Sequence, residues 1–389
     1  MVGIINARIP NTSIGLGLVK NIATEVTKFK ASKVLLTTDK GIVKAGLLQP
    51  IKASLDQAKI IYGVFDGCLP EPTIGLIQSL IKVIKSDGYD LLIAVGGGSI
   101  MDATKAASVF TYSDMTLVDF LKAPRGTVVQ GKVIPKILVP TTAGTGSEWS
   151  QVAVVYDENR MGLPGGMEQY GADRVIIDPE LTRKLPPKIT ADTGFDALTH
   201  AIEAFTCKNA NFISDMLASS AIRLVGQNLF RAYAKGPEDI ESRYYMSLAA
   251  CIGMNAAVTA GMGLCHIVGE YVQAKAHISH GASLAIMLPT VMEFNLASNP
   301  QKFANIAELL GENISGFSNE EAGAKSILAV KKLIDKVKLP KTMRDVGIKE
   351  DDIEIMAQHC FETNSMVIKL WTTQNVSESN ISQIFHSSF

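Results

Sequence analysis

The stretch Asp90-Leu-Leu-Ile-Ala-Val-Gly-Gly-Gly-Ser-Ile-Met-Asp-Ala-Thr-Lys105 decides the fold. Its apolar start predicts a buried strand, three glycines follow, and a helix is predicted over Asp102–Phe110. Glycines between a strand and a helix let bare backbone approach a phosphate, and the helix N-terminus supplies N–H groups and positive potential. The sequence therefore predicts a phosphate-binding loop, and a plain glycine turn before a helix stays open as the alternative.

Strands alternate with helical patterns on both sides of this stretch. The predicted strands are Lys33–Thr38, Lys59–Phe65 and Ile134–Val139, and the predicted helical segments are Gly41–Leu55 and Pro72–Lys85. This alternation is typical of a parallel sheet with helices on both faces. We therefore expect an α/β domain in the N-terminal half.

The pattern changes from Asp192 onward, where strand signals nearly vanish and helical periodicity dominates. The predicted helices are Asp192–Phe205, Asp215–Leu229, Pro237–Val258, Gly263–Ala276, Gln301–Leu310 and Ala322–Val337. A boundary at Leu185-Pro-Pro187 gives an α/β domain over residues 1–187 and an all-helical domain over residues 188–389.

Composition sets limits on the class of protein. A chain of 389 residues favours two domains, and 47% hydrophobic residues supply two cores. The net charge of -1 argues against a nucleic-acid partner or a basic membrane contact. We find neither a secretory signal nor a transmembrane run. The five scattered cysteines are interpreted as reduced thiols of a cytoplasmic enzyme.

Three of the six histidines fall in one pattern with a carboxylate. Asp196 and His200 are four residues apart on a predicted helix, so both side chains share one face. His266 and His280 complete a set that suits Fe(II), Zn(II) or Mn(II). His277 is a competing ligand. The sequence thus predicts a metal-dependent dehydrogenase.

Two further features point to a dinucleotide. Pro140-Thr-Thr-Ala-Gly-Thr-Gly-Ser-Glu148 follows a predicted strand, and its four hydroxyls suit a diphosphate and a ribose. Asp39 ends the first strand, where a carboxylate accepts hydrogen bonds from an adenosine ribose and repels a 2′-phosphate. This favours NAD over NADP. A Ser/Thr-rich turn and a helix cap are the structural alternatives.

Taken together, these segments resemble the iron-containing alcohol dehydrogenase family, in the branch of lactaldehyde reductase and 1,3-propanediol dehydrogenase. The resemblance covers the whole chain. The matching segments are Gly96–Ser99 with Asp102 and Lys105, Pro140–Glu148, Asp178–Pro187, Asp196–Glu203 and Leu288–Asn295.

The resemblance implies a fold, a site and a reaction. The fold is the dehydroquinate synthase-like one, with an α/β dinucleotide domain and an all-α metal-binding domain. The implied metal ligands are Asp196, His200, His266 and His280, with Fe(II) favoured over Zn or Mn. The implied cofactor-lining residues are Gly97, Gly98, Ser99, Asp102, Thr141, Thr142 and Thr145. The reaction is hydride transfer between NAD(H) and a small alcohol or aldehyde, in the aldehyde-reducing direction, by a homodimer or larger homo-oligomer.

The chain departs from this family at four positions. Ala257 and Thr290 are two of them, and the other two concern catalysis and the cofactor. Glu270 stands four residues after His266, where most members carry a second histidine near the nicotinamide. A glutamate with a raised pKa can relay protons, so Glu270 and His266 are the candidate catalytic residues, although Glu270 could equally have no catalytic role. A lysine that members usually carry after Asp157 is missing, and Arg160 stands nearby.

Other functions remain as alternatives. A hydroxyacid-oxoacid transhydrogenase keeps its NAD bound, and a dehydroquinate-synthase-like lyase eliminates phosphate. The lyase needs a cluster of Lys, Arg and His near the metal, which the sequence does not suggest. A non-catalytic scaffold derived from a dehydrogenase would have lost ligands or glycines that this chain retains.

Overall fold

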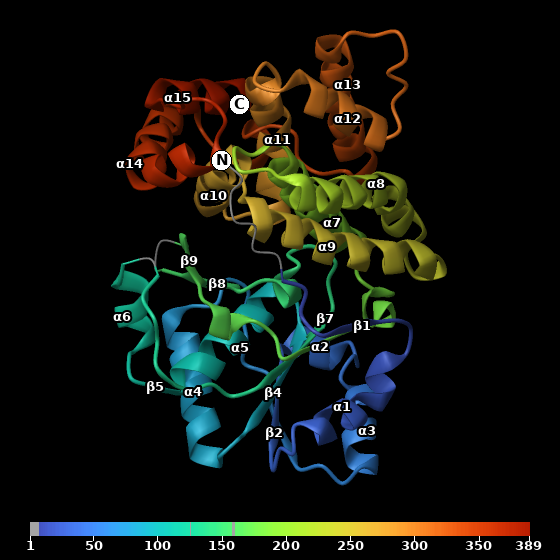
Figure 1. Cartoon of the computed structure of the whole chain (residues 1–389), viewed down its shortest axis with the longest axis vertical. Helices are drawn as coiled ribbons and strands as arrows, with labels where there is room; N and C mark the ends of the chain where they lie inside the picture. The colour runs from blue at the N-terminus through green and yellow to red at the C-terminus, as the bar shows by residue number, and fades with distance from the viewer. Residues whose placement is uncertain (1–7, 125, 158–159) are drawn as a thin grey trace. The chain divides into compact units, whose positions relative to one another are not determined.

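The computed structural model describes residues 8–124, 126–157 and 160–389 of the chain. These residues form two compact units, shown in Figure 1. The α/β unit contains Arg8–Thr142 and Gly146–Arg183, and the helical unit contains Lys184–Phe389 together with Ala143–Thr145.

A six-stranded sheet forms the centre of the α/β unit. Its strands, in spatial order, are β1 (Thr12–Ile14), β10 (Arg174–Ile177), β7 (Lys136–Pro140), β4 (Leu91–Gly96), β2 (Val34–Thr37) and β3 (Tyr62–Phe65). Every neighbouring pair is parallel. The predicted parallel sheet is therefore confirmed.

Helices cover both faces of this sheet, as the burial of β4 shows. Leu92 lies in one core with α4 (Ile74–Asp87) and α5 (Gly98–Phe110). Its neighbours Leu91 and Ile93 lie in a second core with α1 (Ile22–Lys28) and α3 (Gln49–Gln57). The residues of β4 enter the two cores in alternation because successive side chains of a strand point to opposite faces of the sheet. A strand buried on both faces is apolar throughout, which is the pattern that the sequence displays.

The remaining elements of this unit lie outside the main sheet. Helices α2 (Lys40–Lys44) and α6 (Leu117–Lys122) are short. Strands β5 (Tyr112–Ser113) and β6 (Gly131–Lys132) form one antiparallel pair, and β8 (Val152–Tyr156) and β9 (Gly162–Gly166) form another. The stretch predicted as one amphipathic segment, Gly41–Leu55, is divided into α2 and α3 by Gly46, whose φ of 74° interrupts a helix.

In the second unit, the described residues form helices joined by loops, as predicted. Its helices are α7 (Pro187–Thr206), α8 (Phe212–Lys235), α9 (Ile240–Ala260), α10 (Leu264–Ala276), α11 (His280–Leu296), α12 (Pro300–Leu309), α13 (Asn319–Val337), α14 (Ile353–Trp371) and α15 (Glu378–Ser387). Helix α7 packs against α8, α9 and α11 and is buried from Thr190 to Phe205, except at Thr193. It is the central element from which the site of this unit is built.

Two observations concern the whole set of described residues. No single helix in them has the length and apolar character of a membrane span, although α9 and α10, bent by 113° at their junction, meet that criterion when joined. All five cysteines are buried.

Candidate active site

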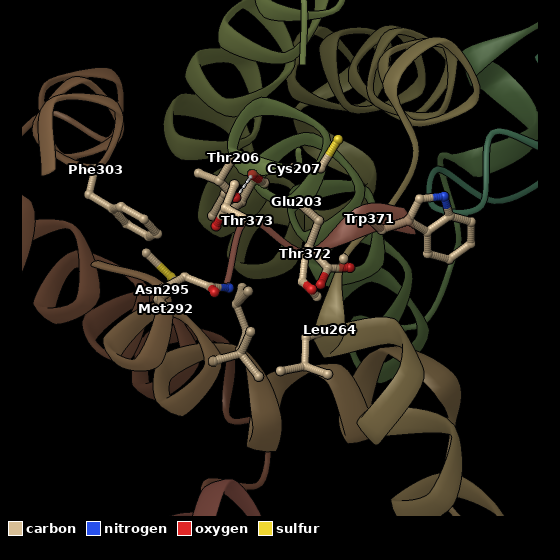
Figure 2. A pocket seen from close by; sticks show the side chains of 14 residues that line it. Glu203, Thr206, Cys207, Leu264, Met292, Asn295, Phe303, Trp371, Thr372 and Thr373 are labelled. Carbon is tan, nitrogen blue, oxygen red and sulfur yellow. Dashed lines mark hydrogen bonds between the residues drawn. The ribbon is translucent and has the colours of Figure 1, made fainter. Parts of the chain in front are cut away.

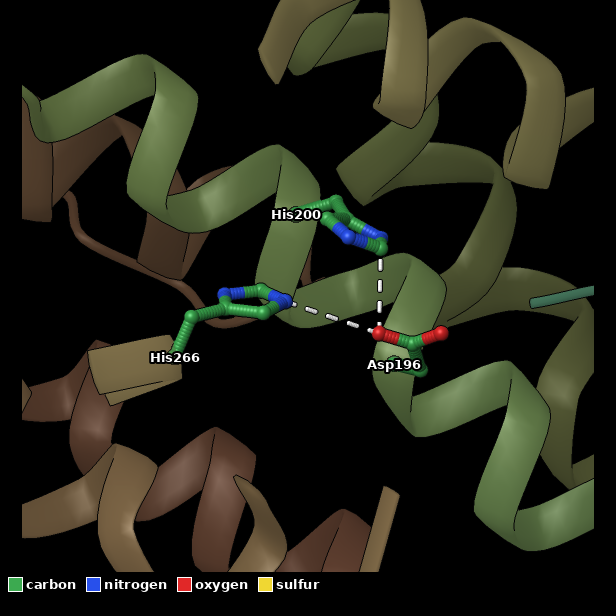
Figure 3. A group of neighbouring side chains, drawn as sticks. All are labelled: Asp196, His200 and His266. Carbon is green, nitrogen blue, oxygen red and sulfur yellow. Dashed lines mark ion pairs between the residues drawn. The ribbon is translucent and has the colours of Figure 1, made fainter. Parts of the chain in front are cut away.

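Three imidazoles converge on one carboxylate oxygen in the helical unit. The Nδ1 atom of His200 lies 3.4 Å from Oδ1 of Asp196, and Nε2 of His266 lies 3.6 Å from the same oxygen. The Nε2 atom of His280 lies 3.7 Å from it. Figure 3 shows His200 and His266 directed toward Asp196. The rings of His200 and His266 are stacked with centroids 4.5 Å apart.

Helix geometry explains this convergence. Asp196 and His200 are one turn apart on α7, which places them on one face of that helix. His266 lies in the first turn of α10, and His280 is the first residue of α11. Two helix starts therefore bring histidines from distant parts of the sequence to a single face of α7. The structure brings together all four residues of the predicted ligand set.

The buried polar atoms of this cluster fit a divalent metal ion. Asp196 Oδ1, His200 Nδ1 and His266 Nε2 are buried and have no hydrogen-bond partner among the described residues. Buried polar atoms are normally paired, so three unpartnered atoms that lie close together fit a shared divalent cation. One carboxylate oxygen and imidazole nitrogens form a donor set that Fe(II), Zn(II) and Mn(II) accept.

The protonation states of Asp196 and His200 agree with that assignment. Burial alone would raise the pKa of Asp196, but the imidazoles of His200, His266 and His280 outweigh burial and hold it below its ordinary value. Burial lowers the pKa of His200 to about 3, so its ring is neutral at neutral pH. A neutral imidazole and an ionised carboxylate are the states in which these side chains bind metals.

Glu203 holds His266 in place, a role that the sequence analysis did not assign. Its Oε2 lies 2.5 Å from Nδ1 of His266, and its Oε1 accepts the Cys265 amide at 2.5 Å. Burial would lower the pKa of His266, but the neighbouring carboxylates of Asp196 and Glu203 raise it to about 9. A carboxylate on the far nitrogen fixes the ring and frees Nε2 for a metal. Gly263 is needed beside it, since a Cβ there would lie 2.6 Å from Glu203 Oε1.

His280 is held in a similar way. Its Nδ1 lies 2.8 Å from Oε1 of Gln273, one turn before the end of α10. His277, the competing candidate, occupies the C-cap of α10 with φ 54°. Neither Glu203 nor Gln273 carries a motif of its own. Their signal in the sequence is spacing, because Glu203 is three residues after His200 and Gln273 is seven after His266.

A second set of predicted residues meets at the carboxyl ends of neighbouring strands in the α/β unit. Helix α5 begins at Gly98, four residues earlier than predicted, so the glycines themselves form its N-terminus. The Thr141 amide donates to the Gly96 carbonyl at 3.0 Å, and a Cβ on Gly97 would lie 3.3 Å from the Thr142 hydroxyl. The two predicted loops are therefore in contact. An anion fits here because the first turn of a helix presents free N–H groups.

Other predicted cofactor residues have partners of their own. Asp39 is the N-cap of α2 and accepts the Ile42 amide at 2.8 Å. The Ser99 hydroxyl accepts the Glu71 amide at 3.3 Å. Asp102 is 8% exposed and bonded to protein groups through both carboxylate oxygens. Thr145 belongs to the three-residue segment that groups with the helical unit.

The structure also shows where Glu270 and Arg160 lie, at two of the positions where the chain departs from the family pattern. Glu270 lies one turn after His266 on α10 and is partly exposed. Together with burial, its charge raises the pKa of Cys360. Arg160 makes a two-point contact with Glu71, with Nε to Oε2 at 2.6 Å and Nη2 to Oε1 at 2.7 Å.

A small pocket of about 20 Å³ lies beside Glu203, as Figure 2 shows. Asn295, Trp371 and Thr372 are among its lining residues. The Asn295 Oδ1 atom is buried and has no partner among the described residues. A polar space of this size has room for one ordered water molecule.

Comparison with known proteins agrees with this geometry. The model of iron-containing alcohol dehydrogenase matches residues 10–179, and that of the Fe-containing alcohol dehydrogenase family, C-terminal, matches residues 190–389. The NAD-dependent methanol dehydrogenase of Bacillus methanolicus is 34% identical, over 91% of this chain and 92% of that protein. The sulfoacetaldehyde reductase of Bilophila wadsworthia is 34% identical, over 91% of each. A crystal structure of 1,3-propanediol oxidoreductase superimposes with a TM-score of 0.94, at 31% identity over the full length of both chains.

Proposed function

Because this chain belongs to the iron-containing alcohol dehydrogenase family, and is therefore an oxidoreductase of alcohols or aldehydes, we propose that it reduces a small aldehyde with NADH. When bound, NADH would supply the hydride, and a divalent metal, Fe(II) by preference, would supply Lewis acidity toward the carbonyl oxygen. The observation that carries the proposal is the set of three buried, unpartnered atoms on Asp196, His200 and His266.

The residues of the helical unit would each have a defined task. Asp196, His200, His266 and His280 would hold the metal, since their donor atoms face one point. Glu203 and Gln273 would keep a proton on Nδ1 of His266 and His280, which leaves Nε2 of each ring as a donor. The protein thereby fixes the geometry of the site before substrate arrives.

The residues of the α/β unit would hold the dinucleotide. Gly97, Gly98 and Ser99 lie at the N-terminus of α5, which attracts the diphosphate. Thr141 and Thr142 would add hydrogen bonds from the neighbouring loop, and Asp39 would accept from the adenosine ribose and exclude a 2′-phosphate. The NAD dependence of the methanol dehydrogenase relative supports NAD in the same role.

Glu270 would exchange the proton that the alcohol product needs. It lies one turn from His266 on α10, where its partial exposure gives contact with solvent. A carboxylate can take this part in place of an imidazole when its pKa is suitably raised. We also propose that the enzyme works in the cytoplasm as a homodimer or larger homo-oligomer.

The experiment is NADH oxidation by metal-free enzyme reconstituted with Fe(II), Zn(II) or Mn(II). The aldehydes include neutral ones (propanal, lactaldehyde, 3-hydroxypropanal) and anionic ones (succinic semialdehyde, sulfoacetaldehyde). We expect turnover that requires a metal and is lost in His200→Ala. Glu308→Gln, an exposed change on α12, is the matched control and should leave turnover unchanged.

Two results would contradict the proposal. Turnover by the metal-free enzyme at the rate of the reconstituted enzyme would remove the metal from the reaction. Tight NAD binding without multiple turnover of NADH, together with hydride exchange between a hydroxy acid and an oxo acid, would favour the transhydrogenase alternative.

A further inference from the structure

A fully buried ammonium group lies below the phosphate loop. Lys105, on α5, has a relative exposure of 0%. Its Nζ atom lies 2.5 Å from the Ser147 carbonyl, 2.6 Å from the Ser147 hydroxyl, 2.9 Å from the Val152 carbonyl and 3.2 Å from the Ser150 hydroxyl. A buried charge persists only where such partners replace water. All of these partners lie in one segment, Ser147–Val152, which begins inside the second cofactor loop.

Asp102, one turn earlier on the same helix, completes the arrangement. Its Oδ1 accepts the Ser147 hydroxyl at 2.5 Å and lies 3.5 Å from Lys105 Nζ. Its Oδ2 accepts the Val154 amide at 3.0 Å. Both carboxylate oxygens are thus bonded inside the protein. Asp102 has the partners of a structural residue, although its position in the glycine motif suggests contact with the cofactor.

This network connects the two loops proposed to hold the dinucleotide. Helix α5 begins in the first loop at Gly98, and Ser147 lies near the end of the second loop, Pro140–Glu148. Asp102 and Lys105 both lie on α5, and their side chains bond to the segment Ser147–Val154. It therefore fixes the distance and orientation of one loop relative to the other.

We propose that Asp102 and Lys105 are positioning residues that hold the second cofactor loop against the first, without touching the dinucleotide. The inference rests on the proposed function, because it assumes that both loops contact NADH. Lys105 cannot reach a ligand at the loop surface, since no part of its side chain is exposed. Any effect of Lys105 on cofactor affinity must then pass through Ser147 and its neighbours.

The test compares two ligands on the full-length enzyme. NADH, followed by its fluorescence, needs both loops, whereas ADP probes the diphosphate site at the first loop. We expect Lys105→Met to weaken NADH binding by about tenfold or more, because it leaves the Asp102 charge and two carbonyls without their buried partner. ADP affinity should change by less than about threefold, since the first loop keeps its own backbone geometry.

Three further variants make the result decisive. Ser147→Ala removes the hydroxyl that bridges the pair and should weaken NADH binding in the same direction, and it keeps the measurement available if Lys105→Met does not fold. Asp102→Asn should weaken NADH binding as Lys105→Met does. Lys82→Met, on the exposed side of α4, is the matched control and should bind NADH as the native protein does.

The binding measurements test the positioning role of Asp102 and Lys105 separately from the proposed function. If Asp102→Asn weakens NADH binding while Lys105→Met and Ser147→Ala do not, Asp102 contacts the cofactor directly and the inference is wrong. Equal losses for ADP and NADH also overturn it, since they would indicate general damage. If the native protein itself binds no NADH, the proposed function fails, and that result is distinct from both.

Discussion

At the scale of single residues, the metal site depends on side chains that do not bind metal. Glu203 contacts His266 twice, at the backbone amide and at Nδ1, and also accepts the Cys265 amide. It therefore stabilises the start of α10 from a neighbouring helix, where a negative charge also interacts favourably with the helix dipole. One carboxylate thus fixes both the ligand and the helix that carries it.

Replacing Glu203 by Gln should weaken metal binding by about 10- to 100-fold, because the amide lacks the charge that holds the His266 ring. The dissociation constant of Zn(II), measured by competition with a chromophoric chelator, provides the test. Glu308→Gln serves again as the control. An unchanged dissociation constant for Glu203→Gln would mean that His266 needs no carboxylate to hold it.

At the scale of elements, the sequence predicted the buried strands and amphipathic helices but missed several others. Strand β1 has only three residues and lies at the sheet edge, so it leaves little hydrophobic signal. Helix α11 was not predicted because Pro289 stands inside it and its residues are apolar on nearly every side. Periodicity identifies elements with two unlike faces, and neither β1 nor α11 has them.

The sequence likewise predicted only part of the candidate site. The sequence grouped Asp196, His200, His266 and His280 from their residue types and spacing, whereas the choice of His280 over His277 needed the family resemblance. Contacts such as Glu203 to His266 depend on how α7 and α10 cross, which no local pattern encodes. The sequence therefore predicted the ligand set and left out the residues that orient it.

Packing of α11 on α7 gives a test at this scale. A Cβ on Gly281 would lie 1.8 Å from the Asp192 carbonyl oxygen, so Gly281→Ala must displace the start of α11 and His280 with it. We expect a loss of about 1–3 kcal/mol in the free energy of unfolding, together with weaker metal binding. Gly75→Ala on α4, where a Cβ meets nothing within 4 Å, should be neutral or slightly stabilising. Chemical denaturation measures both, and equal stabilities would contradict the prediction.

The start of the sheet offers a pH-dependent test. Asp90 accepts the amides of Ser32 and Lys33 at 2.8 and 2.9 Å, and so joins the start of β2 to that of β4. Burial alone would raise the pKa of Asp90, but these hydrogen bonds outweigh it and hold the pKa below its ordinary value. The folded state thus favours the ionised form. The stabilisation is present above the unfolded pKa of about 4 and is lost as the pH falls through the folded value.

Asp90→Asn should therefore cost about 1–3 kcal/mol at pH 7, because an amide cannot accept both N–H groups as a carboxylate does. The difference from the native protein should shrink as the pH falls below about 4 and through the lowered folded pKa, below which Asp90 is protonated in both states. Urea unfolding at a series of pH values measures this, with Asp351→Asn as an exposed control. A difference that stays constant down to pH 2 would rule out ionisation as its source.

At the scale of the whole molecule, the two proposed binding functions lie mainly in separate units. The first glycine loop lies in the parallel-sheet unit, as does the second except for Ala143–Thr145, and the histidine cluster lies entirely among helices. The cluster draws its ligands from α7, α10 and α11, so a bound ion would tie three helices together. Metal binding should then act first on the stability of the helical unit.

Hydrogen–deuterium exchange with and without metal tests this division. We expect slower exchange in α7, α10 and α11 on adding Zn(II), with β2 and β4 little changed, because a ligand stabilises the state that binds it by RT ln(1 + [L]/Kd). At a metal concentration of about a thousand times Kd this amounts to about 4 kcal/mol. Protection confined to the parallel-sheet unit would place the metal elsewhere. His280→Ala should reduce the protection without abolishing the fold.

The burial of every cysteine affects how oxygen would inactivate the enzyme. Burial raises the pKa of Cys68, Cys207, Cys265 and Cys360, so little reactive thiolate is present, and all five sulfur atoms are shielded. Peroxide and alkylating reagents would then find no ready target among the thiols. Inactivation of an Fe(II)-loaded sample by oxygen would report oxidation of the metal. Fresh Fe(II) with ascorbate should restore such a sample, and dithiothreitol alone should not.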